Sequence, residues 1–379
     1  MQKELLILLF LLSQGLLGQA VHNFGNLQLH TKGLVGFHTG FINDGSFDDN
    51  LGLIGFYHSE ESLLISGSSS PTFYDFETAV ELDLHLEVPI IIDNSLNFIY
   101  GNITAARNNK NIYTKISENA FCEGAVDIAK INGHAAVEGQ KIFNFPVGNG
   151  NTIRPLSIEF IDGPFLAKCG YFRENPDFPE SFSTGFDIKH KDVDLSSIYA
   201  QEFWNVTTSG MIQITLNWNS DCNLKSIVED VENIMVTGWN KENKKWTNLG
   251  NFKYEGEIDK GWVTSNTFNA NDYEFFTFGF LHNLKNKDSG NYALTPNGDG
   301  ANDFFVLKIV DDYPTNKLLI FNRDGRIVYE KVDYQNEFNG IGNKKIIQKD
   351  QHLPEGVYFY ILEIKEHNLK YQGYIYLAK

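Results

Sequence analysis

A short loop near the end of the chain carries the side chains best suited to bind a metal ion. Asn297, Asp299 and Asp303 lie at spacings of two and four residues, with glycines between them that let the backbone curl. Calcium is bound by about six to eight oxygen atoms, but this loop offers only two carboxylates, and Lys308 stands where an EF-hand loop ends in glutamate. The spacing therefore predicts either a weak calcium site or a turn in which the aspartates accept backbone N–H groups.

The remaining sequence shows no catalytic motif. None of its serines lies in the Gly-x-Ser-x-Gly pattern of hydrolase nucleophiles, and none of its 10 histidines forms a His-Glu-x-x-His pattern. A glycosidase needs only two carboxylates in a cleft, so abundant Asp and Glu leave hydrolysis open, although acidic surface positions are the ordinary interpretation. We therefore expect no enzyme activity, no catalytic residue and no cofactor apart from calcium.

Aromatic and sulfur-containing side chains give weaker indications. The five tryptophans all precede residue 281, and they form either a platform for stacking on sugar rings or, as the sequence favours, part of a core: Trp204, Trp218, Trp239, Trp246 and Trp262. The three cysteines allow at most one intramolecular disulfide, and no pair has metal-ligand spacing: Cys122, Cys169 and Cys222. Three buried free thiols are an equally good interpretation.

The charge is strongly negative and unevenly distributed. The chain has 379 residues and a formal net charge of −17, with 31 Lys and Arg against 48 Asp and Glu. From residue 281 onward the two classes are equal in number, so the whole acidic excess lies in the first three quarters. An acidic body argues against nucleic-acid binding, which needs a basic surface, and favours solubility over a specific cationic partner.

The last quarter of the chain reads as two hairpins. The polar turn 322–325 ends in glycine and separates two apolar runs, 318–321 and 327–329. A second polar cluster at 365–368 separates the runs 357–364 and 371–377. Both faces of the 357–364 run are apolar, which predicts a strand covered on both sides in a small β-sandwich.

Three motifs in this region occur in a specific order. They are Pro-Asn-Gly-Asp-Gly-x-Asn-Asp at 296–303, Ile-Phe-Asn-Arg-x-Gly at 320–325, and Leu-Pro-x-Gly-x-Tyr-Phe-Tyr at 353–360. Together they resemble the gliding-motility-associated C-terminal domain of Bacteroidetes, the type B sorting domain of type IX secretion. The resemblance implies that residues 294–379 are a sorting domain recognised by the type IX secretion machinery, which exports the protein to the cell surface or the medium.

The N-terminus is typical of a signal peptide. Lys3 supplies positive charge, an apolar run spans 5–12, and Gly18-Gln19-Ala20 offers small residues for cleavage after Ala20. We therefore assign residues 1–20 to the signal peptide. No later segment approaches the roughly 20 apolar residues of a spanning helix, so we expect no transmembrane segment in the mature chain.

Between these ends the sequence predicts an all-β protein. Short apolar runs divided by Gly, Asn and Ser fill residues 21–142, which favours a few turns of a β-solenoid or, as a close alternative, a meander. Residues 143–155, rich in Gly and Pro, are assigned as a connector and residues 282–293 as a polar linker. Alternating strands across 156–281 suit an immunoglobulin-like β-sandwich.

These observations predict a secreted or cell-surface protein without catalytic activity. An adhesin-like or structural role, with a link to gliding, is the leading hypothesis, and a glycan-binding protein or a secreted hydrolase is the alternative. An exposed aromatic groove would favour glycan binding, whereas two facing carboxylates in a deep pocket would favour hydrolysis.

Overall fold

The three-dimensional structure is a computed structural model of the chain. It describes residues 20–281, 290–344, 352–365 and 369–378. The predicted signal peptide, apart from Ala20, and residues 282–289 of the predicted linker lie outside the described residues. Nearly all elements are strands, as the sequence predicts. No helix among the described residues has the length and apolar character of a membrane span.

Contacts divide the chain into two compact units, which we describe separately. The first unit reaches to Lys191 and adds Ser197–Ile227 and Ile234–Gly279. The second unit comprises Asp192–Ser196, Val228–Asn233 and the chain from Phe280 onward. The solenoid and the C-terminal sheet domain are both present, whereas the exact domain boundaries inferred from the sequence stay predictions.

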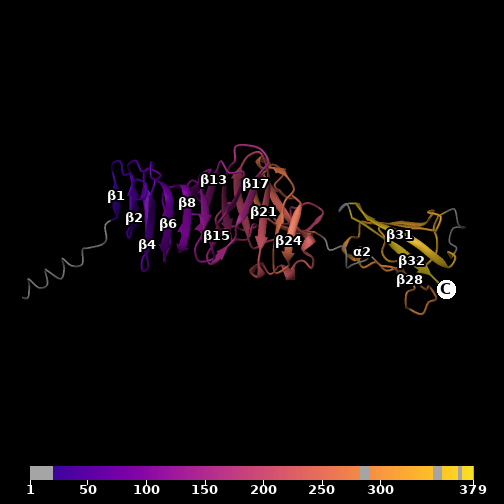
Figure 1. Cartoon of the computed structure of the whole chain (residues 1–379). Helices are drawn as coiled ribbons and strands as arrows, with labels where there is room; N and C mark the ends of the chain where they lie inside the picture. The colour runs from indigo at the N-terminus through magenta and orange to yellow at the C-terminus, as the bar shows by residue number, and fades with distance from the viewer. Residues whose placement is uncertain (1–19, 282–289, 345–351, 366–368, 379) are drawn as a thin grey trace, which may run out of the picture. The chain divides into compact units, whose positions relative to one another are not determined.

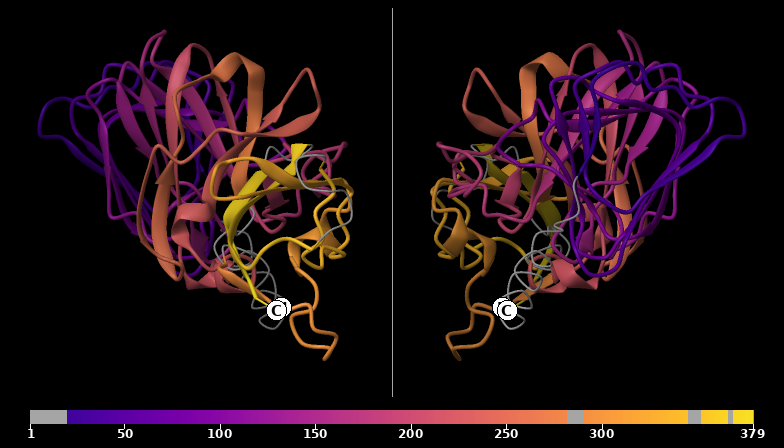
Figure 2. Two further views of the ribbon diagram at one scale, coloured as in Figure 1. Left: turned by 90° about the vertical axis from the view of Figure 1, so that its right-hand side faces the viewer. Right: turned by 90° about the vertical axis from the view of Figure 1, so that its left-hand side faces the viewer.

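The first unit begins with a β-solenoid, in which successive strands join two parallel sheets in turn (Figures 1 and 2). The first sheet contains, in order, β1 (Val21–Asn23), β3 (Phe41–Asn43), β5 (Leu63–Gly67), β7 (Leu84–Leu86), β9 (Ile103–Thr104) and β12 (Ile131–Asn132). The second contains β2 (Leu34–Phe37), β4 (Leu53–His58), β6 (Thr72–Val80), β8 (Ile90–Tyr100), β10 (Tyr113–Ile116) and β13 (His134–Glu138), with β11 (Phe121–Glu123) beside β8. The solenoid, rather than the meander, is correct.

The solenoid coils differ in length, which explains why no repeat period is visible in the sequence. Leu84 pairs with Ile103 one coil later, whereas Ile103 pairs with Ile131, so a coil takes between 19 and 28 residues. Turns between strands absorb most of the difference, and the pairing of β6 with β8 also contains two register shifts.

Phenylalanine and asparagine fill the inside of the coils. Buried phenylalanine rings contact one another from coil to coil, with Phe37 stacked on Phe56 and Phe56 tilted against Phe76. The set comprises Phe37, Phe41, Phe47, Phe56, Phe73 and Phe76. Asn23 and Asn43 occupy paired positions, and the Asn23 amide donates to Asn43 Oδ1 at 2.8 Å. A buried amide needs such partners, and its neighbour one coil away supplies them.

Beyond the solenoid the second sheet continues with antiparallel strands. It runs from β13 through β18 (Leu166–Phe172), β20 (Phe203–Thr208), β27 (Tyr273–Leu281), β22 (Ile234–Asn240) and β23 (Lys245–Asn248), with β19 (Leu195–Ile198) beside β27. The predicted connector 143–155 contains short strands, β15 (Gly148–Asn149) and β16 (Thr152–Ile153). Because β13 pairs directly with β18, one sheet passes from the solenoid into the region predicted as immunoglobulin-like.

A third sheet completes the first unit. It consists of β14 (Ile142–Phe145), β17 (Leu156–Phe160), β21 (Met211–Trp218), β25 (Lys260–Thr264) and β24 (Lys253–Glu257), with β26 (Phe268–Asn269) beside β21. Short 3₁₀ helices lie in the connections of this unit: η2 (Ser220–Cys222), η3 (Leu224–Ser226) and η5 (Ala270–Asp272). A further one, η4 (Val231–Asn233), belongs to the second unit. All three cysteines are free thiols.

The second unit contains one five-stranded sheet among its described residues. Its order is β28 (Tyr292–Leu294), β32 (Leu369–Leu377), β31 (Gly356–Ile364), β29 (Lys317–Phe321) and β30 (Ile327–Val332), with the short helix α2 (Ile309–Asp312) in a connection. Both predicted hairpins are confirmed, since β29 pairs with β30 and β31 with β32.

The expectation that β31 is covered on both sides is wrong. Tyr358, Tyr360 and Leu362 are buried, but Phe359 on the opposite face is 48% exposed. The described residues provide no second sheet against that face, and the buried face packs instead on loops that carry Phe305 and other apolar side chains. Alternating aromatic residues fit a half-exposed strand as well as a covered one, so the sequence could not distinguish the two.

A charged cluster lies on the edge hairpin of this sheet. Glu330 pairs with Lys317 at 2.6 Å and with Lys344. The hydrogen bond from Lys317, followed by that from Lys344, lowers the pKa of Glu330 to about 2. The carboxylate is therefore charged under all but strongly acidic conditions.

Candidate functional site

The outer face of the third sheet is the best candidate for a binding site. In β17 and β21 every second side chain is apolar and buried: Leu156, Ile158, Phe160, Ile212, Ile214 and Leu216. Side chains alternate between the two faces of a strand, so the intervening polar residues must point outward. The core-facing pattern of these strands thus fixes a polar outer face.

One row of side chains crosses all five strands of this face. Asn144 pairs with Ser157, and Ser157 pairs with Thr215. Thr215 in turn pairs with Thr264, and Thr264 with Lys253. Cross-strand partners have neighbouring Cβ atoms, so residues separated by up to 120 positions in the sequence form one continuous strip.

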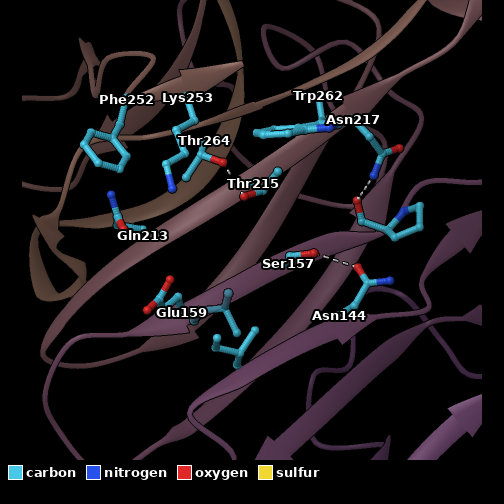
Figure 3. Close-up of a pocket in the computed structure, with 13 residues that line it drawn as sticks. Asn144, Ser157, Glu159, Gln213, Thr215, Asn217, Phe252, Lys253, Trp262 and Thr264 are labelled. Atoms are coloured by element: carbon cyan, nitrogen blue, oxygen red, sulfur yellow. Dashed lines mark hydrogen bonds between the residues drawn. The ribbon is translucent and has the colours of Figure 1, made fainter. Parts of the chain in front are cut away.

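Figure 3 shows that this strip forms the floor of a hollow. The hollow has a volume of about 500 Å³, which lies within the range of sites for small molecules. Phe252 and Trp262 both lie on the side of the hollow formed by β24 and β25, separated from each other along the strand direction, and the side chain of Phe252 is 58% exposed. We call this hollow, lined by the outward side chains of β14, β17, β21, β25 and β24, the sheet groove.

Trp262 differs from the other tryptophans. The remaining four are buried, as expected for core residues: Trp204, Trp218, Trp239 and Trp246. Trp262 is partly exposed and lines the sheet groove. The sequence prediction of core packing is therefore correct for four of the five, and the fifth is available to a ligand.

Three amide side chains of the sheet groove are held in fixed orientations. Asn144 Oδ1 accepts from Ser157 Oγ at 2.9 Å, and Asn217 Nδ2 donates to the carbonyl of Pro155 at 2.7 Å. Gln213 Nε2 donates to the backbone carbonyl of Ser265, directly after β25, at 3.0 Å. Each amide has further hydrogen-bonding capacity, in the N–H groups of Asn144 and in the side-chain oxygens of Gln213 and Asn217.

The charges lining the sheet groove are few. Among the described lining residues Glu159 carries the single carboxylate, and Lys141 Nζ lies 3.9 Å from Glu159 Oε1. Lys253 supplies an ammonium group and lies 5.4 Å from the ring centroid of Phe252. A pair of carboxylates on opposite sides of a substrate, the arrangement of most glycosidases, is therefore missing from the described lining of this groove.

The predicted calcium residues do come together in one loop. Asp303 accepts N–H groups from both glycines of the loop, at 2.6 and 2.8 Å, and Asp299 accepts from Ala301 at 2.8 Å. The Ala301 N–H and the Asn297 amide lower the pKa of Asp299. This geometry is that of Asx turns, and the described residues contain no group of three or more His, Cys, Asp or Glu placed to hold a metal ion. Calcium binding at Asn297, Asp299 and Asp303 stays a prediction.

Sequence reasoning did not find the sheet groove. Its lining comes from strands spread over residues 142–264, and each polar position alone looks like ordinary solvent-exposed surface. One signal for the groove was present in the sequence: residues 211–218 alternate strictly and place two amides on the outer side of the strand. This alternation predicts a polar strand face, but it does not show which other strands lie beside it.

Comparison with known proteins identifies only the C-terminal part. Residues 288–377 match the family model of the CHU_C Type IX secretion signal domain. This match confirms the resemblance of residues 294–379 to a sorting domain and marks the chain for export by the type IX secretion system to the cell surface or the medium. Neither a curated protein nor a solved structure matches the chain.

Proposed function

We propose that this protein is an adhesin-like, non-catalytic protein that binds a glycan in the sheet groove after export. The observation that carries the proposal is the combination of Trp262 and Phe252 with three oriented amides on one sheet face. A sugar ring has an apolar C–H face and a rim of hydroxyl groups, so it needs a flat aromatic surface beside donors and acceptors.

The shape of the sheet groove favours an extended ligand over a compact one. The strip from Asn144 to Lys253 crosses five strands, and neighbouring strands lie about 4.8 Å apart. Its length of roughly 20 Å suits several sugar units in a row. A sheet face that is open to solvent suits the side of a polysaccharide better than its end.

The single carboxylate of the groove supports binding rather than hydrolysis. Glycoside hydrolysis requires two carboxyl groups about 5–9.5 Å apart, and Glu159 has a lysine neighbour instead. A secreted hydrolase is therefore the weaker alternative. A role in gliding rests on the resemblance of the C-terminal domain alone and stays a prediction.

The test uses the mature full-length chain and a panel of soluble neutral polysaccharides in affinity electrophoresis. Trp262→Ala should weaken binding about tenfold or more, because aromatic side chains that become buried against a ligand contribute much of the binding free energy. Phe178→Ala is the matched control, since this exposed phenylalanine lies outside the groove. Undiminished binding by Trp262→Ala, binding by no polysaccharide, or release of reducing ends by the parent would each contradict the proposal.

A further inference from the structure

Lys130 has no exposed surface, which is unusual for a lysine. It lies directly before β12, where the last coil of the solenoid begins. Its Nζ lies 2.9 Å from Asn102 Oδ1 and within hydrogen-bond distance of the backbone oxygens of Asp127 and Gly150. No carboxylate among the described residues forms an ion pair with it at hydrogen-bond distance, so the burial of this amine calls for an explanation.

The Asn102 amide is held between Lys130 and a carboxylate. Asp83 Oδ1 accepts from both Nδ2 and the backbone N–H of Asn102, each at 2.9 Å. Asp83 Oδ2 accepts from Thr104 Oγ1 at 3.0 Å, which fixes the carboxylate plane. The three side chains thus form one hydrogen-bonded chain. The Lys130 amine contacts the amide oxygen of Asn102, and the amide nitrogen of Asn102 contacts the Asp83 carboxylate.

The solenoid itself brings these groups together. Ile103 of β9 pairs with Ile131 of β12, so the residues that precede them, Asn102 and Lys130, are neighbours on adjacent coils. The Ile103 N–H also donates to the Lys130 carbonyl at 2.9 Å. A parallel register of this kind holds the two side chains in contact wherever the coils are folded.

We propose that Lys130 and Asn102 join in an intramolecular isopeptide bond, with Asp83 as the acid–base catalyst. The neutral Nζ attacks Cγ of Asn102, and the Nζ–Cγ bond forms. In the resulting tetrahedral adduct Nζ and Nδ2 are bonded to the same carbon, and the Asp83 carboxylate, which is already in contact with Nδ2, transfers one proton from Nζ to Nδ2. The Cγ–Nδ2 bond then breaks and ammonia leaves, so the reaction needs no other reactant.

Burial of Lys130 acts toward the neutral amine that this reaction requires, whereas the three oxygens around Nζ match the three donors of an ammonium group. Burial lowers its pKa, and the charge of Arg107 acts in the same direction, although Asp127 and Asp83 oppose both. A neutral amine has two N–H donors and one lone pair. The backbone oxygens of Asp127 and Gly150 can accept the two donors of the neutral amine. In the structure Nζ donates to Asn102 Oδ1 as well, so its lone pair reaches Cγ of Asn102 once this third N–H is lost and the amine turns toward the amide carbon.

The bond would fasten a short strand pairing of the first sheet. β9 and β12 are only two residues long and pair at two positions, whereas β10 and β13 join the same coils at four positions in the second sheet. A covalent link between residues 102 and 130 closes a loop across that pairing and restricts the unfolded chain, as a disulfide does. Outside the cell, such a link needs neither paired cysteines nor an oxidant.

Mass spectrometry of the intact, purified mature chain tests the proposal. The parent should be lighter than its sequence mass by one molecule of ammonia, and a digest should contain one branched peptide with both Asn102 and Lys130. Lys130→Met and Asn102→Ala should restore the full sequence mass, and so should Asp83→Ala. Lys115→Met, which changes another lysine of the solenoid, should keep the ammonia loss.

The branched peptide separates this reaction from other losses of ammonia, such as cyclisation of an Asn-Gly sequence, which leaves the chain linear. A parent with the full sequence mass would overturn the proposal whatever the variants do. An Asp83→Ala chain that still forms the bond would remove the catalytic role of Asp83.

Discussion

A buried ion pair in the first unit allows a quantitative test of its packing. Arg154 and Glu202 have side chains only 3% and 4% exposed, and Arg154 Nε lies 3.1 Å from Glu202 Oε2. Tyr171 donates its hydroxyl to the same carboxylate, and Arg154 also contacts Cys222 Sγ at 3.1 Å. Burial alone would lower the pKa of Arg154, but the Glu202 charge overrides it and raises that pKa above its usual value.

The informative variant is Glu202→Gln, which keeps the size of the side chain and removes its charge. The guanidinium of Arg154 is then buried without a counter-charge. Breaking a buried pair in this way costs about 3–5 kcal/mol of unfolding free energy. For a unit of this size, about 2–4 °C in Tm accompanies each kcal/mol, so we expect Tm to fall by roughly 6–20 °C.

Tryptophan fluorescence is a selective assay for this change. All five tryptophans belong to the first unit, and Trp204 Nε1 donates to the Arg154 carbonyl at 3.0 Å. The matched control is Asp259→Asn, which breaks an exposed pair with Lys225, their side chains being 55% and 65% exposed. Surface pairs contribute about 0–1 kcal/mol, so the control should lose only a few degrees.

If Glu202→Gln lowers Tm no more than Asp259→Asn does, the buried ion pair does not stabilise this unit as we expect. A double variant, Arg154→Met with Glu202→Leu, provides a second check. Replacing both partners by apolar side chains is often neutral or stabilising, so the double variant should be more stable than the single one. A double variant that is less stable would show that the remaining contacts of Arg154, rather than its charge, hold this region together.

Three further predictions concern the C-terminal domain. Deletion of 294–379 should leave the protein in the periplasm, and fusion of this segment to a signal peptide and reporter should export the reporter; fractionation checks both. Calcium at millimolar concentration should raise the Tm of the parent, but not of a variant with Asp299→Ala and Asp303→Ala; an unchanged parent leaves only the Asx turns. Because the pKa of Glu330 is depressed from 4.5 to about 2, its stabilisation should be present above about pH 4.5 and disappear as pH falls toward about 2. Glu330→Gln should therefore differ from the parent at neutral pH and converge with it in acid, measured on the calorimetric transition that lacks a change in tryptophan fluorescence.

Local patterns were sufficient to predict much of the C-terminal sheet. The turn at 322–325 joins strands that are neighbours in sequence, so glycine placement and β-branched residues identify the hairpin directly. The hairpin of β22 and β23, which flank the polar turn after Asn240, likewise joins strands that are neighbours in sequence. Where pairing is between sequence neighbours, composition and spacing contain most of the information.

Non-local pairing explains what the sequence could not show. The coils of the solenoid differ in length, so their register depends on packing that no fixed period reveals. The same limit applies to Arg154 and Glu202, which are 48 positions apart, and to Lys130 and Asn102, which become neighbours only through the pairing of β9 with β12. Charged or amide side chains at such positions look like surface residues until the fold is known.

The charge distribution restricts the ligand of the sheet groove further. The acidic excess of the chain lies before residue 281, in the part that carries the groove. A polyanionic glycan would approach against this field, and Lys253 is the single cation among the described residues that line the groove. A neutral glycan avoids that repulsion, and its affinity should not change with ionic strength, because screening acts only between charges. An affinity that falls as salt rises would instead indicate an ionic ligand, such as an amino-sugar polymer attracted by the acidic body. Titrating a neutral polysaccharide and an amino-sugar polymer at low and at physiological salt decides between the two, and tighter, salt-dependent binding of the amino-sugar polymer would contradict a neutral ligand even if Trp262→Ala abolished binding.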